Sequence, residues 1–501
     1  MRDWLIKIRR HDHSSLQTQI RESLVAAILD GQLERDEPVP STRRMAKVLG
    51  VSRNTVVIAY QALLDDGYLV ARERSGYYVS DKAMDGATSC RRRSPARASG
   101  ALSNEGHRSG PAWESRFTVR PALMENISKP LDWQNYAYPF IYGQVDHDLF
   151  PIAEWRDCAR QALGRRWLGT WTNDTWDHDD ELLVEQIRRR LLPRRGIMAH
   201  EQEILITLGA QNALYLLARL LVQKGTPVAM EEPGFPDARN IFALREAQIE
   251  FMPIDSGGAV VSERLQRSAV VFVTPSHQFP TTVTMPIERR LQLLDLASRR
   301  DFLIIEDDYE FETNYIGEPC PALKSLDDEG RVIYVGSLSK TLFPGLRLGF
   351  MVGPKALIEE ARALRRLMIR HTPNNNQRTA ALFLSLGHHD SLIRRLHRSY
   401  GARWAILGDA LHRHLPGCAT IPSFGGTSFW VKGPDGLDAE HLAHAARQRS
   451  VFIEPGRINY ARPPLPCCEF RLGFSSIDES RIEDGIRHLA QVIAQETVRA
   501  A

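Results

Sequence analysis

Apolar residues recur three to four positions apart between residues 16 and 29, a spacing that places them on one face of a helix. Two shorter periodic segments follow, one between Ser41 and Gly50 and one between Ser52 and Gly67. Each begins with a serine that can cap a helix and closes with a glycine that can end one. The pattern therefore predicts three helices, of which the last two form a helix-turn-helix.

The third of these helices is followed by residues that favour strands. Tyr68–Val70 and Tyr77–Val79 flank a turn at Arg74–Gly76, which predicts a β-hairpin of the kind called a wing. The buried face of the third helix is expected to consist of Val56, Ala59, Tyr60, Leu63 and Leu64.

The composition changes after residue 80. Residues 81–112 are rich in Ser, Gly, Ala and Arg and contain almost no large apolar side chain, so we expect a flexible linker there. From Trp113 onward, short apolar runs alternate with amphipathic helical patterns, which is typical of an α/β fold. The sequence thus predicts a winged helix-turn-helix domain over 1–80, a linker over 81–112 and an α/β domain over 113–501.

Whole-chain properties agree with this division and narrow the class of protein. A chain of 501 residues exceeds what one hydrophobic core usually organises. The net charge of +3 carries no information about nucleic acid, but the first hundred residues are rich in arginine. No apolar run is long enough to span a bilayer and no signal-peptide pattern is present, so we expect a cytoplasmic protein. The six cysteines lack zinc-site spacing, which favours free thiols and no metal.

The start of the third predicted helix carries side chains that suit DNA. Arg53, Asn54 and Thr55 can reach base edges and phosphates when a recognition helix enters the major groove with its N-terminus first. Arg43, at the start of the preceding helix, can hold a phosphate. The alternative is a three-helix domain used for protein contacts, because helix-turn-helix geometry alone is not rare.

The detail of the pattern favours DNA binding. The stretch resembles the GntR family of bacterial regulators, including that family's P-S-x-R-x-x-A and V-S-R-x-T-V motifs. The resemblance implies DNA contacts at Arg43, Ser52, Arg53, Asn54, Thr55 and Gly76, and double-stranded operator DNA as a partner. Val57 stands where many members have arginine, so the base preference at that position is open.

In the α/β region, the chemistry lies where the candidate strands end, which is where ligands bind in doubly wound sheets. Five apolar runs are followed by groups of polar, small or aromatic residues: Gly209–Asn212, Glu231–Phe235, Thr274–Pro280, Glu306–Tyr309 and Gly336–Lys340.

Each group alone has an ordinary explanation, such as a solvated loop lysine for Lys340 or a core aromatic for Phe235. Together they supply an amine, a carboxylate such as Asp307, the phenol of Tyr309 and a small-residue turn at a helix N-terminus. These are the parts that a pyridoxal 5'-phosphate (PLP) site requires: a group to form the imine, one to protonate the pyridine nitrogen, one to tune the ring hydroxyl and one to hold the phosphate. No G-x-G-x-x-G motif follows a first strand, so a dinucleotide site finds no support.

From about residue 113 to its end, the chain resembles a fold-type I aminotransferase. The resemblance implies a mainly parallel sheet with a smaller C-terminal α+β subdomain. The fusion to a GntR-type domain is similar to the MocR regulators, whose relatives respond to compounds such as γ-aminobutyrate, taurine or pyridoxal species. The resemblance implies that Lys340 is the Schiff-base lysine and that Arg471 holds an effector carboxylate. It implies further cofactor contacts at Asp307, Tyr309, Ala210, Gln211, Phe235, Ser337, Ser339 and Arg347. Asp307 is preferred to Asp308 because strand alternation points the two to opposite faces and the family's motif uses the first.

The sequence departs from the aminotransferase pattern in several places. Phe279-Pro280 replaces the common Asn-Pro, which removes one polar contact to the cofactor. Ala210 stands where many relatives have serine, and Thr282 where they have glycine. Residues 176–181 replace a glycine-containing loop that usually helps to enclose the substrate. These departures make efficient turnover less expected and leave the identity of the effector open.

Two functions remain from different classes. In one, the large domain is a sensor, in which an amine or amino acid exchanges with Lys340 to form an external aldimine and biases the DNA-binding domains. In the other, the chain is an active aminotransferase with a DNA-binding appendage. A third interpretation, a cofactor-free dimerisation scaffold, is disfavoured by the complete set of Lys, Asp, Tyr and Arg. The resemblance also implies a head-to-tail homodimer.

Overall fold

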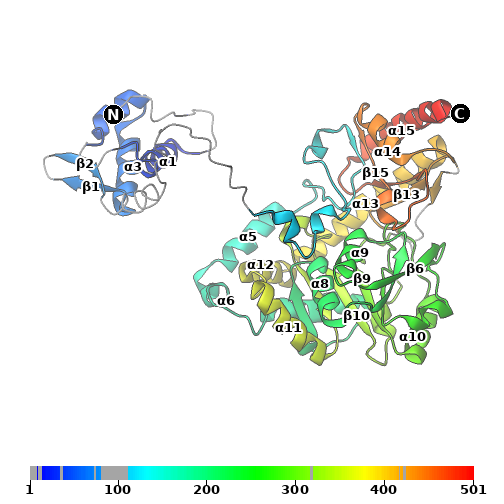
Figure 1. The fold of residues 1–501 in the computed structure, drawn as a ribbon. Helices are drawn as coiled ribbons and strands as arrows, with labels where there is room; N and C mark the ends of the chain where they lie inside the picture. Colours follow the sequence, from blue (N-terminus) through cyan, green and yellow to red (C-terminus); the bar gives the residue numbers. More distant parts are fainter. Residues whose placement is uncertain are drawn as a thin grey trace, which may run out of the picture. The chain divides into compact units, whose positions relative to one another are not determined.

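The protein was analysed as a computed structural model, in which the chain divides into two compact units, 1–112 and 113–501 (Figure 1). The structure describes residues 8, 14–33, 38–72, 75–80, 111–315, 320–416, 418–420 and 425–500. The linker expected over 81–112 therefore lies almost entirely outside the described residues, as does Arg74 of the expected wing turn.

The N-terminal unit contains the helix-turn-helix and the hairpin. Its elements are α1 (Leu16–Leu29), α2 (Thr42–Leu49), α3 (Arg53–Asp65), β1 (Leu69–Arg72) and the antiparallel β2 (Gly76–Val79). Ser41 and Ser52 cap α2 and α3 through hydrogen bonds from the backbone N–H three residues on. Gly50 ends α2 in the left-handed region at φ +63°, as expected of a terminal glycine.

The core of this unit is formed by the apolar faces of its helices. Ile20 and Leu24 of α1 pack with Val56, Tyr60 and Leu63 of α3, all nearly inaccessible to solvent. The expected stripe is confirmed at these positions, whereas Leu64 is only half-buried. α3 ends at Asp65, two residues before the glycine expected to stop it.

The large unit is built on an eight-stranded sheet in the order β4-β11-β10-β9-β8-β5-β6-β7. The pairs from β10 through β9, β8 and β5 to β6 are parallel, while β11 and β7 run antiparallel to their neighbours. The strands are β4 (Ile204–Thr207), β5 (Pro227–Glu232), β6 (Gln248–Asp255), β7 (Gly258–Ala259), β8 (Val270–Val273), β9 (Leu303–Asp308), β10 (Val332–Ser337) and β11 (Gly349–Val352). The predicted mainly parallel α/β sheet is confirmed, and β11 and β7 make it a mixed sheet.

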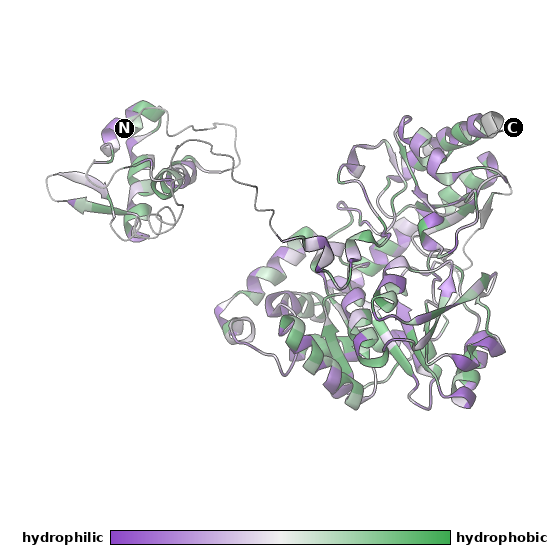
Figure 2. Ribbon diagram, viewed as in Figure 1, coloured by the Kyte–Doolittle hydropathy of each residue, from purple (hydrophilic) through white to green (hydrophobic). Residues whose placement is uncertain are grey.

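Helices cover both faces of this sheet, which explains why its strands are continuous apolar runs (Figure 2). Ile305 faces α8 (Ala210–Leu221), α9 (Pro236–Ala243) and α11 (Lys355–Ile369), whereas its neighbour Ile304 faces α10 (Ile287–Arg300). The remaining helices of the described large unit are α5 (Ile152–Ala162), α6 (Leu168–Thr172), α7 (Glu181–Gln186), α12 (Asn374–Ser385), α13 (His388–His414), α14 (Ala439–Arg447) and α15 (Glu479–Ala500).

A smaller C-terminal subdomain is formed by a four-stranded antiparallel sheet, which α14 and α15 accompany. Its strands are β12 (Ala419–Thr420), β13 (Ser428–Lys432), β15 (Glu454–Pro455) and β16 (Glu469–Gly473). Near the beginning of the large unit, β3 (Tyr138–Pro139) pairs in parallel with β14 (Val451–Phe452) of this subdomain. Within the described ranges, no helix has the length and apolar content needed to cross a membrane.

Candidate functional site

A cavity of about 260 Å³ lies where the parallel strands of the large sheet end. Its walls come from segments that are far apart in the sequence. The lining residues include Lys340, Asp307, Tyr309, Ala210, Gln211, Phe235, Ser337, Ser339, Arg347 and Arg471, which are all of the cofactor and effector residues that the resemblance implies. The structure thus brings these residues to one place.

Lys340 follows β10 and extends its amine into the aromatic part of this cavity. Its Nζ lies 4.2 Å from the ring centroid of Tyr142 and 5.9 Å from that of Tyr309. Burial lowers the pKa of Lys340 to about 8, so a neutral, nucleophilic amine is accessible near neutral pH. Gly143 lies close beside it, because a Cβ at that position would be 2.8 Å from Nζ.

Asp307, the last residue but one of β9, lies beneath the same cavity and carries an unused hydrogen-bonding atom. It is 3% exposed, and its Oδ1 accepts no hydrogen bond from the described residues. Burial, followed by the nearby charge of Asp308, raises the pKa of Asp307 to about 7. A buried carboxylate without a donor fits a ligand that brings a cationic N–H, such as a protonated pyridine nitrogen.

The neighbouring Asp308 points to the opposite side of the strand, as alternation requires. Its Oδ2 accepts hydrogen bonds from Nε of Arg195 at 2.7 Å and from the Tyr334 hydroxyl at 2.9 Å. Burial opposes ionisation, but Arg195 and these donors hold the pKa of Asp308 below its usual value. Asp308 is therefore a structural ion-pair partner, which leaves Asp307 alone facing the cavity.

Tyr309 and two phenylalanines form the aromatic side of the cavity. The Tyr309 hydroxyl donates a hydrogen bond to the backbone carbonyl of His277 at 2.8 Å, and burial raises its pKa well above the usual value, so the phenol is neutral. Phe279 packs edge-on against Tyr309 at 6.0 Å and Phe235 at 5.2 Å. The aromatic residue found in place of asparagine thus joins an aromatic cluster.

The far end of the cavity has the features of a phosphate site. α8 begins at Ala210, directly after Gly209, which has a φ of +77°. Arg347 reaches across this turn, and its Nη2 donates to the carbonyl of Leu208 at 3.2 Å. A Cβ on Gly209 would lie 3.0 Å from Nη2 of Arg347, so a larger residue would crowd that guanidinium. Free backbone N–H groups, a helix N-terminus and an arginine together suit an anion.

Arg471 lies at the opposite end and already has a protein partner. Its Nε donates a hydrogen bond to Oε2 of Glu454 at 2.9 Å, and its Nη2 lies 2.8 Å from the same oxygen as an ion pair. The guanidinium carbon lies 3.9 Å from the ring centroid of Tyr142 and 4.7 Å from that of Phe279. An acid group that binds Arg471 therefore has to share the guanidinium with Glu454.

Sequence reasoning missed four residues around Lys340 and Arg471: Lys129, Tyr142, Gly143 and Glu454. The first three lie in a segment without helical or strand periodicity, and β15, which begins at Glu454, has only two residues. The one signal in the sequence was the glycine that follows Tyr142, because a glycine can mark a tight turn. In the structure Gly143 has a φ of +71°.

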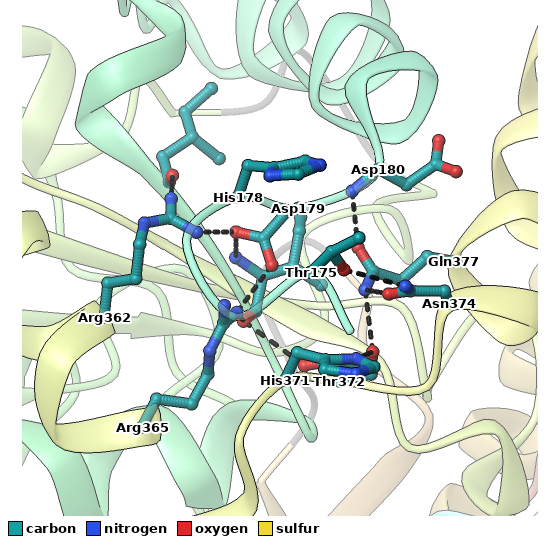
Figure 3. A network of polar contacts seen from close by, with 12 residues as sticks. Thr175, His178, Asp179, Asp180, Arg362, Arg365, His371, Thr372, Asn374 and Gln377 are labelled. Atoms are coloured by element: carbon teal, nitrogen blue, oxygen red, sulfur yellow. Dashed lines mark hydrogen bonds and ion pairs between the residues drawn. The ribbon is translucent and has the colours of Figure 1, made fainter. Parts of the chain in front are cut away.

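Residues 176–181, which the resemblance compares with a loop that helps to enclose the substrate, do not line this cavity. They form part of a buried polar network away from it, shown in Figure 3. Asp179 accepts from Nη1 of Arg365 at 2.6 Å, and the backbone N–H of Asp180 donates to the Gln377 side chain at 3.0 Å. These contacts give the loop a structural role. The glycine that lies beside Lys340 is instead Gly143.

Thr282 also differs from the glycine of many relatives, and the backbone shows why glycine is common there. Its φ is +64°, in the left-handed region that a β-branched residue rarely adopts. The Thr282 hydroxyl donates to the carbonyl of Thr281 at 2.6 Å, which satisfies the side chain locally.

The residues expected to contact DNA lie at the surface of the N-terminal unit. Arg43, Arg53 and Asn54 are exposed, and Gly76 lies at the start of β2 with a φ of +115°. Ser52 and Thr55 have a local task as well, because their hydroxyls are 2.8 Å apart and Ser52 accepts the backbone N–H of Thr55. Val57 is also exposed, at 39%.

Comparison with known families separates the same two units. The model described as bacterial regulatory proteins of the gntR family matches residues 16–79, and the model of aminotransferase class I and II matches residues 172–489. Both matches fall on the folds described above.

Similar proteins extend over almost the whole chain. The HTH-type transcriptional regulator TauR of Rhodobacter capsulatus is 43% identical over 479 residues, which cover 96% of each chain. The probable rhizopine catabolism regulatory protein MocR of Rhizobium meliloti is 33% identical and covers 95% of this chain and 93% of its own. Among solved structures, a kynurenine aminotransferase of Pyrococcus horikoshii in complex with PMP is 30% identical with a TM-score of 0.69, covering 76% of this chain and 98% of its own.

Proposed function

Because the chain belongs to the MocR subfamily of GntR-type transcriptional regulators, we propose that its large unit binds PLP at Lys340 and senses a primary amine there. In this proposal, the N-terminal unit binds operator DNA, and the amine changes that binding. GntR-type regulators bind operator DNA, and the aminotransferase class I and II fold is the fold of PLP enzymes.

One observation carries the cofactor assignment: the buried Asp307 has an oxygen without a donor at the floor of the cavity that Lys340 enters. The protonated pyridine nitrogen of PLP would supply the missing donor. When bound, PLP supplies an aldehyde that condenses with amines. The resulting imine absorbs near the visible edge of the spectrum.

The other residues of the cavity have complementary tasks. The turn at Ala210 and Gln211, with Ser337, Ser339 and Arg347, would bind the phosphate and fix the position of the ring. Phe235 would stack on the ring, and Tyr309, a neutral phenol, could turn its hydroxyl from the carbonyl of His277 to the ring hydroxyl.

For sensing, the chain has to present Lys340 as an exchangeable amine. The lowered pKa of Lys340 favours its release in the neutral form when another amine takes its place. Occupancy by that amine can shift DNA binding only if the ligand favours one arrangement of the protein over another. We further propose a homodimer whose two N-terminal units contact two half-sites.

The test combines a spectrum and a DNA titration on the full-length protein. Protein loaded with PLP should show an absorbance band that primary amines shift, and the same amines should change its affinity for DNA from its own promoter region. The proposal fails if amines that shift the spectrum leave DNA binding unchanged at saturation.

A second function, aminotransferase activity, is favoured by the completeness of the lysine, aspartate, tyrosine and arginine set in one cavity. Fold alone does not separate the two functions. Steady-state formation of a keto acid from an amine and a 2-oxo acid, over many turnovers per protein, would support the enzyme and count against a sensor without turnover.

A further inference from the structure

Lys129 enters the cavity from the segment that precedes β3, and neither the mechanism above nor the sequence pattern uses it. Its Nζ donates to the backbone carbonyl of Tyr142 and lies 5.4 Å from the centroid of that tyrosine ring. The side chain is one-quarter exposed, so its charge remains accessible from the cavity. Burial is the largest influence on Lys129 and lowers its pKa, while Glu454 opposes that effect.

Glu454 is shared by two cations. Its Oε2 accepts a hydrogen bond from Nε of Arg471 and forms an ion pair with Nη2 of the same arginine, and its Oε1 lies 3.7 Å from Nζ of Lys129. That Oε1 is buried and accepts no hydrogen bond from the residues that the structure describes. One carboxylate therefore stands between two positive groups, and its second oxygen is incompletely satisfied.

We propose that Lys129 is a specificity-determining residue, which lets the site accept a primary amine that carries an acid group. The inference rests on the proposed function and names its ligand class. The acid group would bind the Arg471 guanidinium, and Glu454 would then turn toward Lys129 as its remaining counter-ion.

The physical reason is the cost of a buried, unpaired charge. When an acid group binds Arg471, it competes with Glu454, which is 7% exposed and cannot return to bulk water. A buried carboxylate that loses its partner is strongly unfavourable, whereas one with a nearby ammonium is not. Lys129 thus lowers the penalty for admitting a second negative charge. An amine without an acid group leaves the Arg471–Glu454 pair intact and gains nothing from Lys129.

The contacts of the segment that carries Lys129 make DNA affinity a second quantity to measure, besides the cofactor spectrum. Asn240 donates to the backbone carbonyl of Glu125 at 2.8 Å, and Arg457 pairs with the Glu125 side chain at 3.3 Å. This segment lies near the start of the large unit, which begins at Trp113. In this proposal, a change of counter-ion at Lys129 would act on a segment close in sequence to the junction of the two units.

The experiment compares matched ligands that differ only in the acid group: γ-aminobutyrate against n-butylamine, β-alanine against n-propylamine, and taurine against ethylamine. Each is titrated into full-length protein loaded with PLP, and the shift of the cofactor absorbance gives a half-saturating concentration. The quantity of interest is the preference, defined as the ratio of the two concentrations within a pair. DNA affinity at saturation is measured in parallel.

Three variants are compared with the wild type. Lys129→Met should reduce the preference of the best pair by about tenfold or more, which is the effect of losing one charge-assisted interaction. Lys129→Arg, which retains the cation, should keep most of it. Lys224→Met removes an exposed lysine that pairs with Glu246 at the surface and should leave the preference unchanged.

Several outcomes would overturn the inference. A wild type that prefers the acid-bearing member of no pair contradicts it, as does an unchanged preference in Lys129→Met. A Lys129→Met protein that no longer binds PLP would make the lysine a structural residue. Failure of every amine to shift the wild-type spectrum would instead refute the proposed sensor, so the two failures can be told apart.

Discussion

Replacing Asp307 with asparagine should stabilise the cofactor-free protein above neutral pH and weaken its binding of PLP. Burial and the charge of Asp308 raise the pKa of Asp307 from 3.8 to about 7 in the folded protein. The folded state therefore binds this proton more tightly than the unfolded chain does. The unfolding free energy consequently falls as the pH rises from about 4 to about 7, because the folded protein loses that advantage.

The size of the effect follows from the shift. About three pKa units correspond to at most roughly 4 kcal/mol, at about 1.4 kcal/mol per unit. Asparagine removes the charge and keeps the shape, so this pH-dependent part should be absent from the variant. Loss of the charge that pairs with a pyridinium nitrogen should raise the dissociation constant of PLP by on the order of tenfold or more.

The assay is urea-induced unfolding of the cofactor-free wild type and Asp307→Asn at equal concentration, near pH 5 and near pH 8. Relative to the variant, the wild type should lose about 2–3 kcal/mol between the two conditions, because only the part of the shift between pH 5 and about 7 is sampled. Asp435→Asn, at a surface position whose side chain is 96% exposed, is the matched control and should follow the wild type. If Asp307→Asn and the wild type change in parallel with pH, Asp307 does not carry an unpaired buried charge.

Two further predictions concern the other charged groups. Arg471→Ala should destabilise the large unit by about 3 kcal/mol, because it leaves Glu454 buried without its main partner. Adding Glu454→Ala should recover at least about 1 kcal/mol of this loss. A double-mutant cycle of urea unfolding measures both values, and strictly additive losses would argue against the pair. Arg53→Ala should weaken specific operator binding by about 1–3 kcal/mol with an unchanged cofactor spectrum, and a salt titration should show non-specific binding less affected. Equal loss of both kinds of DNA binding would assign Arg53 to the phosphates alone.

The sequence was most informative where chemistry follows a strand. Lys340, Asp307 and Phe235 each come within a few residues of the end of an apolar run. Parallel strands deliver their carboxyl ends to one edge, so the pattern of apolar runs sufficed to predict their convergence. The choice between Asp307 and Asp308 followed from strand alternation and the family's motif, and the structure places the two on opposite sides. The capped helices of the N-terminal unit were equally predictable, because serine caps and terminal glycines are local signals.

What could not be predicted depends on contacts between distant segments. Lys129 and Glu454 are 325 positions apart and meet only because β3 pairs with β14 beside β15. No local pattern indicates that Arg471 has an internal carboxylate partner. Residues 176–181 were compared by resemblance with a loop that helps to enclose the substrate, but Asp179 and Asp180 are engaged by Arg365 and Arg378, whose positions only tertiary packing determines.

The central claim is that Lys340 holds PLP covalently, and reduction followed by peptide mapping tests it most directly. Full-length protein is loaded with PLP, reduced with borohydride and digested, and the modified peptide is identified by mass. We predict a single phosphopyridoxyl group on Lys340, and its loss in Lys340→Ala together with the absorbance band. Modification of another residue in the wild type, such as the neighbouring Lys129, or a trapped cofactor that persists in Lys340→Ala, would contradict the account.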